Sequence, residues 1–230
     1  MVPLAKQFTN SHLIRTKISL FSAGLDKAAY EFWMHPEFGV VYPEYLYQSH
    51  SIIRASVPLM QATLQVCRSK PHSTEPVLQR FADYLAHHIV EETGHDEWIL
   101  NDAEAIGIPR RLILERIPKN SAKQMVGSQY YWIHHYHPVA MLGYIAVMEG
   151  TPPKTEFIED VARRVRLPLE AFSSFLLHAK VDPRHRADLD ALLDDLPLTE
   201  HHHTLIGLSA LETIQYLETV LLDVNNSHLC

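Results

Sequence analysis

Two short segments of the chain carry carboxylates and imidazoles at spacings that suit metal binding. The residues concerned are Glu91, Glu92 and His95 in the first segment and His178, Asp182 and His185 in the second. In a helix, side chains three or four residues apart lie on one face, so each segment would gather its polar groups on one side. Mixed carboxylates and imidazoles inside a helical core suit iron or manganese. The spacing therefore favours a metal-dependent redox enzyme over a binding module.

The first segment lies in the most polar part of an otherwise amphipathic stretch, residues 81–100. At about 100° per residue, His88 falls on the same side of a helix as His95. Glu91 and Glu92 flank that side, so we expect only one of them to share a target with His95. The competing interpretation is a solvated helix surface, because motif matches are only hypotheses.

The second segment has the spacing His178-x3-Asp182-x2-His185. It could present two imidazoles and a carboxylate to a metal, the ligand types of non-haem iron oxygenases. Pro183 is poorly tolerated inside an uninterrupted helix. Asp182 could therefore instead be the N-cap of a helix that begins at Pro183, and both roles stay open. For the two histidines, the alternative is an ordinary hydrogen-bonded core or surface residue.

Two further residues stand in apolar surroundings. Glu149 ends the apolar stretch 138–148, where an acid is usually buried only if it is paired or bound to metal. Its alternative is an exposed position in the last turn before Gly150. Arg54 lies in an apolar stretch and could bind a substrate carboxylate bidentately. A salt bridge to one of the acids would explain Arg54 equally well.

The frame for these residues is predicted to be all-helical, because apolar residues recur at three- and four-residue spacing almost throughout. Helices are predicted at about 16–34, 43–68, 76–105, 109–117, 121–136, 138–149, 154–166, 168–180, 183–194 and 199–223. Ser121 and Thr199 are expected N-caps, and Gly107 and Gly150 stand where helices should stop. The run of three histidines after Glu200 is expected to be a solvated helix start.

Composition limits the classes of protein that fit. The 230 residues, 47% hydrophobic and 20% charged, indicate one packed domain over residues 1–230, with its core at about 16–223. The net charge of −7 makes nucleic acid an unexpected partner. No apolar run reaches the roughly 20 residues of a membrane span, and the first 15 residues lack the apolar core of a secretory signal. We expect a cytoplasmic protein with no membrane partner.

Four stretches together resemble a known family. They are His88-x2-Glu91-Glu92-x-Gly94-His95-Asp96 with Trp98, then Leu142-Gly143-Tyr144 to Glu149-Gly150, then His178-x3-Asp182-Pro183-x-His185, and the segment Ser49 to Ser56. They resemble the iron-containing redox enzymes of the haem-oxygenase-like superfamily. The match spans roughly residues 40–215, and the His178 stretch is its most specific part.

The resemblance implies an all-α, haem-oxygenase-like helical bundle around a non-haem diiron site that activates O2 to oxidise or cleave a small organic substrate. The implied iron ligands are Glu92, His95, Glu149, His178, Asp182 and His185. Further metal or pocket residues are His50, His88 and Glu91, and the expected substrate-binding residues are Arg54 and Tyr144. Some members of the family have a glutamate where this chain has His88, which implies weaker binding of the second iron.

The superfamily also leaves other functions open. A thiaminase-II-like enzyme needs a nucleophilic cysteine facing the pocket, and Cys67 beside Arg68 is a poor candidate. A cofactor-free enzyme similar to pyrroloquinoline-quinone synthase also lines its pocket with histidines. A third alternative is a non-catalytic protein that binds a small molecule. The substrate, the number of metal ions and the choice between a monomer and a homodimer are not fixed by the residues.

Overall fold

The computed structural model describes residues 8–150 and 152–227, which form helices and no strands. The helices are α1 (Asn10–Phe21), α2 (Ala23–Trp33), α3 (Phe38–Ile53), α4 (Ser56–Arg68), η1 (His72–Thr74), α5 (Pro76–Glu92), α6 (His95–Ala105), α7 (Arg110–Leu114), α8 (Asn120–Tyr131), η2 (Trp132–Tyr136), η3 (Pro138–Ala140), α9 (Met141–Met148), α10 (Thr155–Val165), η4 (Leu169–Phe172), α11 (Ser173–Asp195) and α12 (Glu200–Asn225). The predicted all-α class is confirmed.

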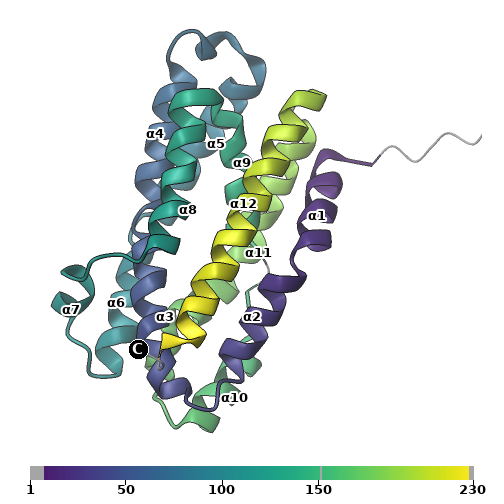
Figure 1. Ribbon diagram of the computed structural model, residues 1–230. Helices are drawn as coiled ribbons and strands as arrows, with labels where there is room; N and C mark the ends of the chain where they lie inside the picture. Colours follow the sequence, from purple (N-terminus) through teal and green to yellow (C-terminus); the bar gives the residue numbers. More distant parts are fainter. Residues whose placement is uncertain (1–7, 151, 228–230) are drawn as a thin grey trace, which may run out of the picture.

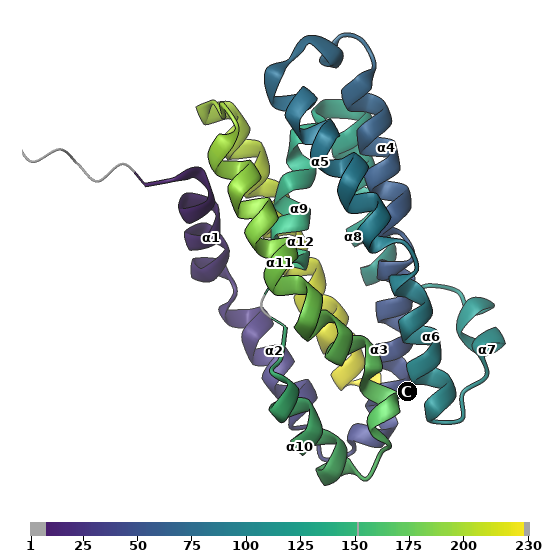
Figure 2. The same cartoon turned by 180° about the vertical axis from the view of Figure 1, so that it is seen from behind.

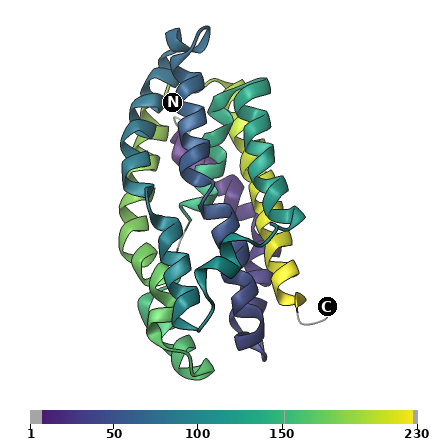
Figure 3. The same ribbon diagram turned by 90° about the vertical axis from the view of Figure 1, so that its left-hand side faces the viewer.

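The helices form an elongated bundle in which α12 packs against α9, α2, α8 and α1 (Figure 1). Seen from behind, α11 lies on one side of the bundle, and α4 and α5 lie on the other (Figure 2). The side view places α11 and α12 on opposite sides of the bundle (Figure 3). Helix α9 lies between these layers and is buried along most of its length. The site described below lies where α5, α9 and α11 approach one another.

The close packing of α9 on α12 depends on Gly143. A Cβ atom at this position would lie 2.1 Å from the backbone oxygen of Ile206 and 2.8 Å from the backbone nitrogen of Ala210. Both neighbours are backbone atoms of α12, which cannot rotate away as a side chain would. A larger residue at position 143 would therefore push α9, and with it the position of Glu149, away from α12.

The predicted helix 16–34 is divided at Ser22 into α1 and α2, and two other predicted helices are also interrupted. The predicted helix 76–105 ends at Glu92 and restarts at His95, because Thr93 is extended and Gly94 adopts the left-handed conformation with φ of 93°. The predicted helix 43–68 is divided at Arg54 and Ala55 into α3 and α4. Apolar periodicity continues across both joints, so it could not locate them.

Helix α11 is continuous where a break was predicted. It runs from Ser173 to Asp195 with Pro183 inside it. Pro183 removes one backbone hydrogen bond, but the helix on both sides of it is anchored by buried residues. Asp182 therefore lies inside a helix, and its alternative role as an N-cap is wrong. Pro43 is likewise accommodated inside α3.

Helix ends are partly as expected. Thr199 caps α12, with its side-chain oxygen accepting from the backbone nitrogen of His202. Ser121 is not a cap, because α8 begins one residue earlier, at Asn120. Among the described residues, α12 also has the length and mean hydropathy of a membrane span. Its packing against α9 and α2 inside the bundle accounts for that hydropathy.

Candidate metal centre

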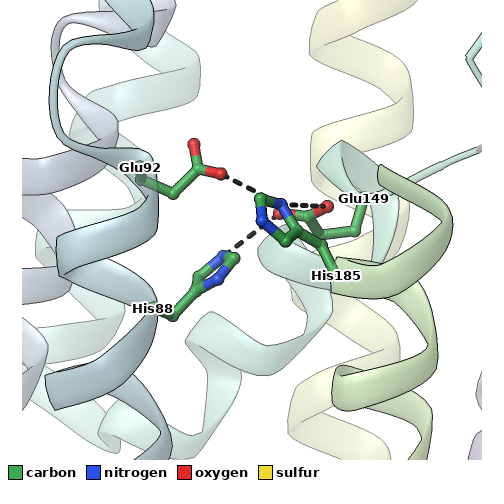
Figure 4. A group of neighbouring side chains, drawn as sticks. All are labelled: His88, Glu92, Glu149 and His185. Atoms are coloured by element: carbon green, nitrogen blue, oxygen red, sulfur yellow. Dashed lines mark hydrogen bonds and ion pairs between the residues drawn. The ribbon is translucent and has the colours of Figure 1, made fainter. Parts of the chain in front are cut away.

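The site is built around the last turn of α5 and the middle of α11. His88 and Glu92 lie one turn apart on α5, Glu149 follows the last residue of α9, and His185 projects from α11. Figure 4 shows their side chains pointing toward one another. One ligand-type atom from each of these four residues lies within 4.8 Å of all the others. The separate segments of the sequence therefore do converge.

Glu92 lies between two imidazoles. Its Oε2 is 3.1 Å from Nδ1 of His95, and its Oε1 is 3.2 Å from Nδ1 of His185. Both ring nitrogens are buried, and the carboxylate oxygens approach them out of line for a hydrogen bond. Two ligands bonded at about 2.1 Å to one ion, roughly at a right angle, lie about 3 Å apart. The two contacts are therefore compatible with Glu92 acting as a metal ligand beside each imidazole.

Glu149 completes the position on the His185 side. Its Oε1 lies 3.1 Å from Nε2 of His88, and its Oε2 lies 3.6 Å from Nδ1 of His185. The break after α9 explains this placement, since Glu149 is the C-terminal cap residue and leaves helical geometry. Glu149 is buried, so its alternative as an exposed last-turn residue is wrong.

His178 lies on the other side of Glu92, beside His95. The two rings meet edge to face with centroids 5.2 Å apart. The Nδ1–H of His178 donates to the backbone carbonyl of Ser174 at 2.8 Å, which leaves Nε2 without a proton and free to bind metal. Trp98 stacks on His95 at 3.8 Å and holds its ring in place. His178 thus lies next to His95, which in turn contacts Glu92.

The protonation of the cluster depends on its own charges. Burial would raise the pKa of Glu92, but the His185 and His95 rings outweigh it and hold the pKa well below its usual range. Contacts with Glu149 and Glu92 raise the pKa of His185 to about 10. Burial, reinforced by Glu149, raises the pKa of Asp182 to about 7. In the metal-free protein, the protonated His185 ring provides positive charge beside Glu92 and Glu149. A bound divalent cation would provide that charge instead.

A cavity of about 70 Å³ adjoins the cluster. Asp182, His178 and Tyr144 line it together with His88, Glu92 and Glu149, and the rest of its wall is Ile53, Ser56, Met60, Met141, Ile145 and Met148. Burial raises the pKa of Tyr144 to about 12, so its hydroxyl keeps its proton. The wall is mostly apolar and carries no lysine or arginine among the described residues. A small, largely uncharged group fits this space.

Four residues named from the sequence lie outside the cluster. His50 is buried in α3 but does not line the cavity; burial, with Arg54, lowers its pKa. Arg54 is exposed at the end of α3 and lines a different hollow, with Lys123 and Tyr130. Glu91 contacts His88 and His185 from the far side of their rings. Cys67 is buried in α4 away from the cavity, and burial raises its pKa to about 12.

A second group of histidines and a glutamate has a structural explanation. Glu75 lies 2.7 Å from Nδ1 of His72 and 3.2 Å from Nε2 of His137. The backbone N–H of Val139 donates to Nδ1 of His137, so the neutral ring carries its proton on Nε2, facing Glu75. If Nε2 of His137 bound a metal, the ring proton would have to lie on Nδ1. Nδ1 could then no longer accept the hydrogen bond from Val139 that caps η3. The group connects η1 to the turn between η2 and η3.

A helical bundle with buried carboxylates and imidazoles on facing helices is the architecture of a non-haem metalloprotein. Residues 44–217 match the iron-containing redox enzyme family, and the chain belongs to that family. The predicted membership in a family of iron-containing redox enzymes is thus confirmed. No curated protein matches the chain.

Solved structures show the same fold. A domain of unknown function with a heme oxygenase-like fold from Shewanella denitrificans OS217 is similar with a TM-score of 0.77, at 17% identity, over 94% of this chain and 91% of that one. A TenA homolog from Pseudomonas syringae pv. tomato DC3000 is similar with a TM-score of 0.69, at 12% identity, over 92% and 90%. A CADD-like protein of unknown function from Nostoc punctiforme PCC 73102 has a TM-score of 0.66, at 12% identity, over 96% of each chain.

Proposed function

We propose that the protein is a non-haem diiron oxidase or oxygenase that uses O2 to oxidise or cleave a small organic substrate. The observation that carries this proposal is the position of Glu92, whose two oxygens face two different buried imidazoles, His95 and His185. A site for a single ion would not need a carboxylate whose two oxygens face different imidazoles. Membership in the iron-containing redox enzyme family supports iron as the metal.

The donor set fits two ferrous ions. One position has His95 and His178, the other has His88, His185 and Glu149, and Glu92 lies between them. Imidazole and carboxylate are the ligands of non-haem iron. The carboxylates of Glu92 and Glu149 would offset half of the charge of two divalent ions. Bound iron would supply the activation of O2 and the redox chemistry.

The protein's own groups would bind the substrate, exclude water and handle protons. The methionine and isoleucine side chains of the cavity remove water from the reacting atoms. With a pKa raised by burial to about 7, the Asp182 carboxyl can hold a proton at neutral pH or release it to a neighbouring group. Tyr144 offers a hydroxyl that keeps its proton and can donate a hydrogen bond to substrate.

Anaerobic titration with Fe(II), followed by exposure to O2 under optical observation, tests the proposal. We expect up to two ions per chain and a new absorption band after oxygen is admitted. His178→Ala and His185→Ala should each weaken iron binding, because each removes one of few ligands. His137→Ala, in the structural group around Glu75, serves as the control and should bind iron like the wild type.

Two results would contradict the proposal. Unchanged iron stoichiometry and affinity in both the His178 and His185 variants would remove the site. Absence of iron binding by the wild-type protein, with small heterocycles still transformed, would favour a metal-free enzyme. Circular dichroism of each variant establishes that a loss of iron does not follow from a loss of helix.

A further inference from the structure

Both rings of one ligand set have their second nitrogen turned toward Glu91. His88 faces Glu149 through Nε2, and its Nδ1 lies 3.6 Å from Oε2 of Glu91. His185 faces Glu92 and Glu149 through Nδ1, and its Nε2 lies 3.9 Å from the same Oε2. Glu91 therefore lies on the far side of the two imidazoles from the cluster. It is not placed to share their ion.

Glu91 is itself held from outside. Its Oε1 accepts a hydrogen bond from Nη2 of Arg184 at 2.7 Å and lies 3.3 Å from Nε2 of His87. The two oxygens therefore have separate neighbours, with Oε1 turned toward the exposed Arg184 and His87 and Oε2 toward the buried rings. The Glu91 side chain is only 19% exposed, although both of its outer partners are well exposed. The carboxylate is fixed at the edge of the site.

The position of Glu91 matters because of where a metal-bound imidazole carries its proton. A ring nitrogen that binds metal must be unprotonated, so the remaining proton of a neutral ring sits on the other nitrogen. For His88 and His185, that proton would point at Oε2 of Glu91. Their side chains are 3% and 6% exposed, so water offers little alternative acceptor. Without Glu91, both N–H groups would lose the carboxylate that faces them.

We propose that Glu91 is a positioning residue that orients His88 and His185 together as ligands of one metal ion, with Arg184 holding Glu91 in place. This inference rests on the proposed function. An acceptor behind a ligating histidine fixes which nitrogen is free and makes that nitrogen a better donor. His178 is served instead by the backbone carbonyl of Ser174. Glu91 should therefore act on one of the two ion positions and leave the other unchanged.

Titration with Co(II) tests the inference, since bound Co(II) reports ligand geometry through its visible absorption. Glu91→Gln keeps the size of the side chain but removes its charge and its ability to accept equally from two rings. We expect one of the two Co(II) ions to bind about 10- to 100-fold more weakly, with an altered spectrum, while the other keeps its affinity and spectrum. Arg184→Gln should weaken the same ion to a smaller extent.

Asp188→Asn is the matched control, because Asp188 lies 3.5 Å from Nε of Arg184 and contacts neither ring. It removes the same unit of charge from the same group of residues and should leave both ions within about threefold of wild type. The inference is overturned if Glu91→Gln binds both ions like the wild type, if it weakens both equally, or if Asp188→Asn has the same effect. If wild-type protein binds no Co(II), the proposed function fails and this inference fails with it.

Discussion

Asp182 is the carboxyl group of the cluster whose charge changes nearest to neutral pH. Burial, followed by the proximity of Glu149, raises its pKa to about 7. In the unfolded chain an aspartate ionises at about 3.9. Between about pH 4 and pH 7, Asp182 is therefore ionised in the unfolded chain but protonated in the folded protein. The unfolded state binds fewer protons than the folded state in this range, so the free energy of unfolding contributed by Asp182 falls as the pH rises. The sign is the reverse of that for a carboxylate that is stabilised by an ion pair.

Asp182→Asn should therefore flatten the pH dependence of stability in the metal-free protein. Between pH 5 and pH 8 we expect the variant to lose less unfolding free energy than the wild type, by about 2 kcal/mol. Urea unfolding at both pH values, in the presence of a chelator, measures the difference. Parallel pH profiles for the two proteins would show that Asp182 is not held in a neutral form.

The same variant addresses metal binding. Because Asp182 lies inside α11, its replacement by Asn or Ala removes no helix cap.

The sequence patterns indicated Asp182 as a ligand or a cap, and only the continuity of α11 decides against the cap. The spacings also selected Glu92, His95, His178 and His185, which do converge. They could not separate Glu91 from Glu92, because that depends on which side of two rings each carboxylate occupies.

At the scale of elements, the joint between α5 and α6 decides where His95 points. In one continuous helix, His95 would lie three residues after Glu92 on the same surface. The break at Thr93 and Gly94 instead starts a new helix at His95 and still leaves its Nδ1 3.1 Å from Glu92. Nothing in the apolar periodicity marks this joint, and a lone glycine in a helical pattern is compatible with an unbroken helix.

Gly94→Ala should destabilise the protein, because an alanine at φ of 93° adopts the left-handed conformation at a cost of about 1–2 kcal/mol. It should also weaken metal binding by displacing His95 from Glu92. Gly127→Ala is the control: Gly127 lies inside α8 with open space around it, and alanine there should stabilise by about 0.5–1 kcal/mol. Thermal unfolding and metal titration compare the two. Equal, stabilising effects would contradict the role given to Gly94.

Proline was the other source of error at this scale. Pro183 predicts a helix end, and on local grounds that is sound. The long helix persists because residues on both sides of Pro183, such as Asp182, His185 and Leu189, are buried against other helices. Tertiary packing of this kind joins residues far apart in the chain. A pattern read along one segment cannot contain that information.

For the whole molecule, the cluster connects three parts of the chain that are distant in sequence. Its residues come from α5, α6, α11 and the end of α9. A metal that binds only the folded chain stabilises it by about 2.7 kcal/mol when present at 100 times its dissociation constant. The all-helical class could be predicted because it depends on periodicity summed over many segments. The order in which helices pack could be expected only from the family resemblance.

Fe(II) added without oxygen should raise the midpoint of thermal unfolding by about 5–10 °C at 100 times the dissociation constant. His185→Ala should lose most of this shift, because the ion no longer joins α11 to α5 and α9. Differential scanning calorimetry, with and without chelator, measures the effect. An equal shift in His185→Ala would place the stabilising ion elsewhere on the protein.

The position of α12 also bears on how the chain is made. This helix packs against α9, α2, α8 and α1, and its residues are made after those of all four. Until they emerge from the ribosome, the surface of α9 around Gly143 lacks the partner that covers it in the folded protein. The nascent chain therefore cannot complete this part of its core before α12 is made. Metal loading should follow the emergence of α12, since Glu149 is fixed only once α9 has packed against α12.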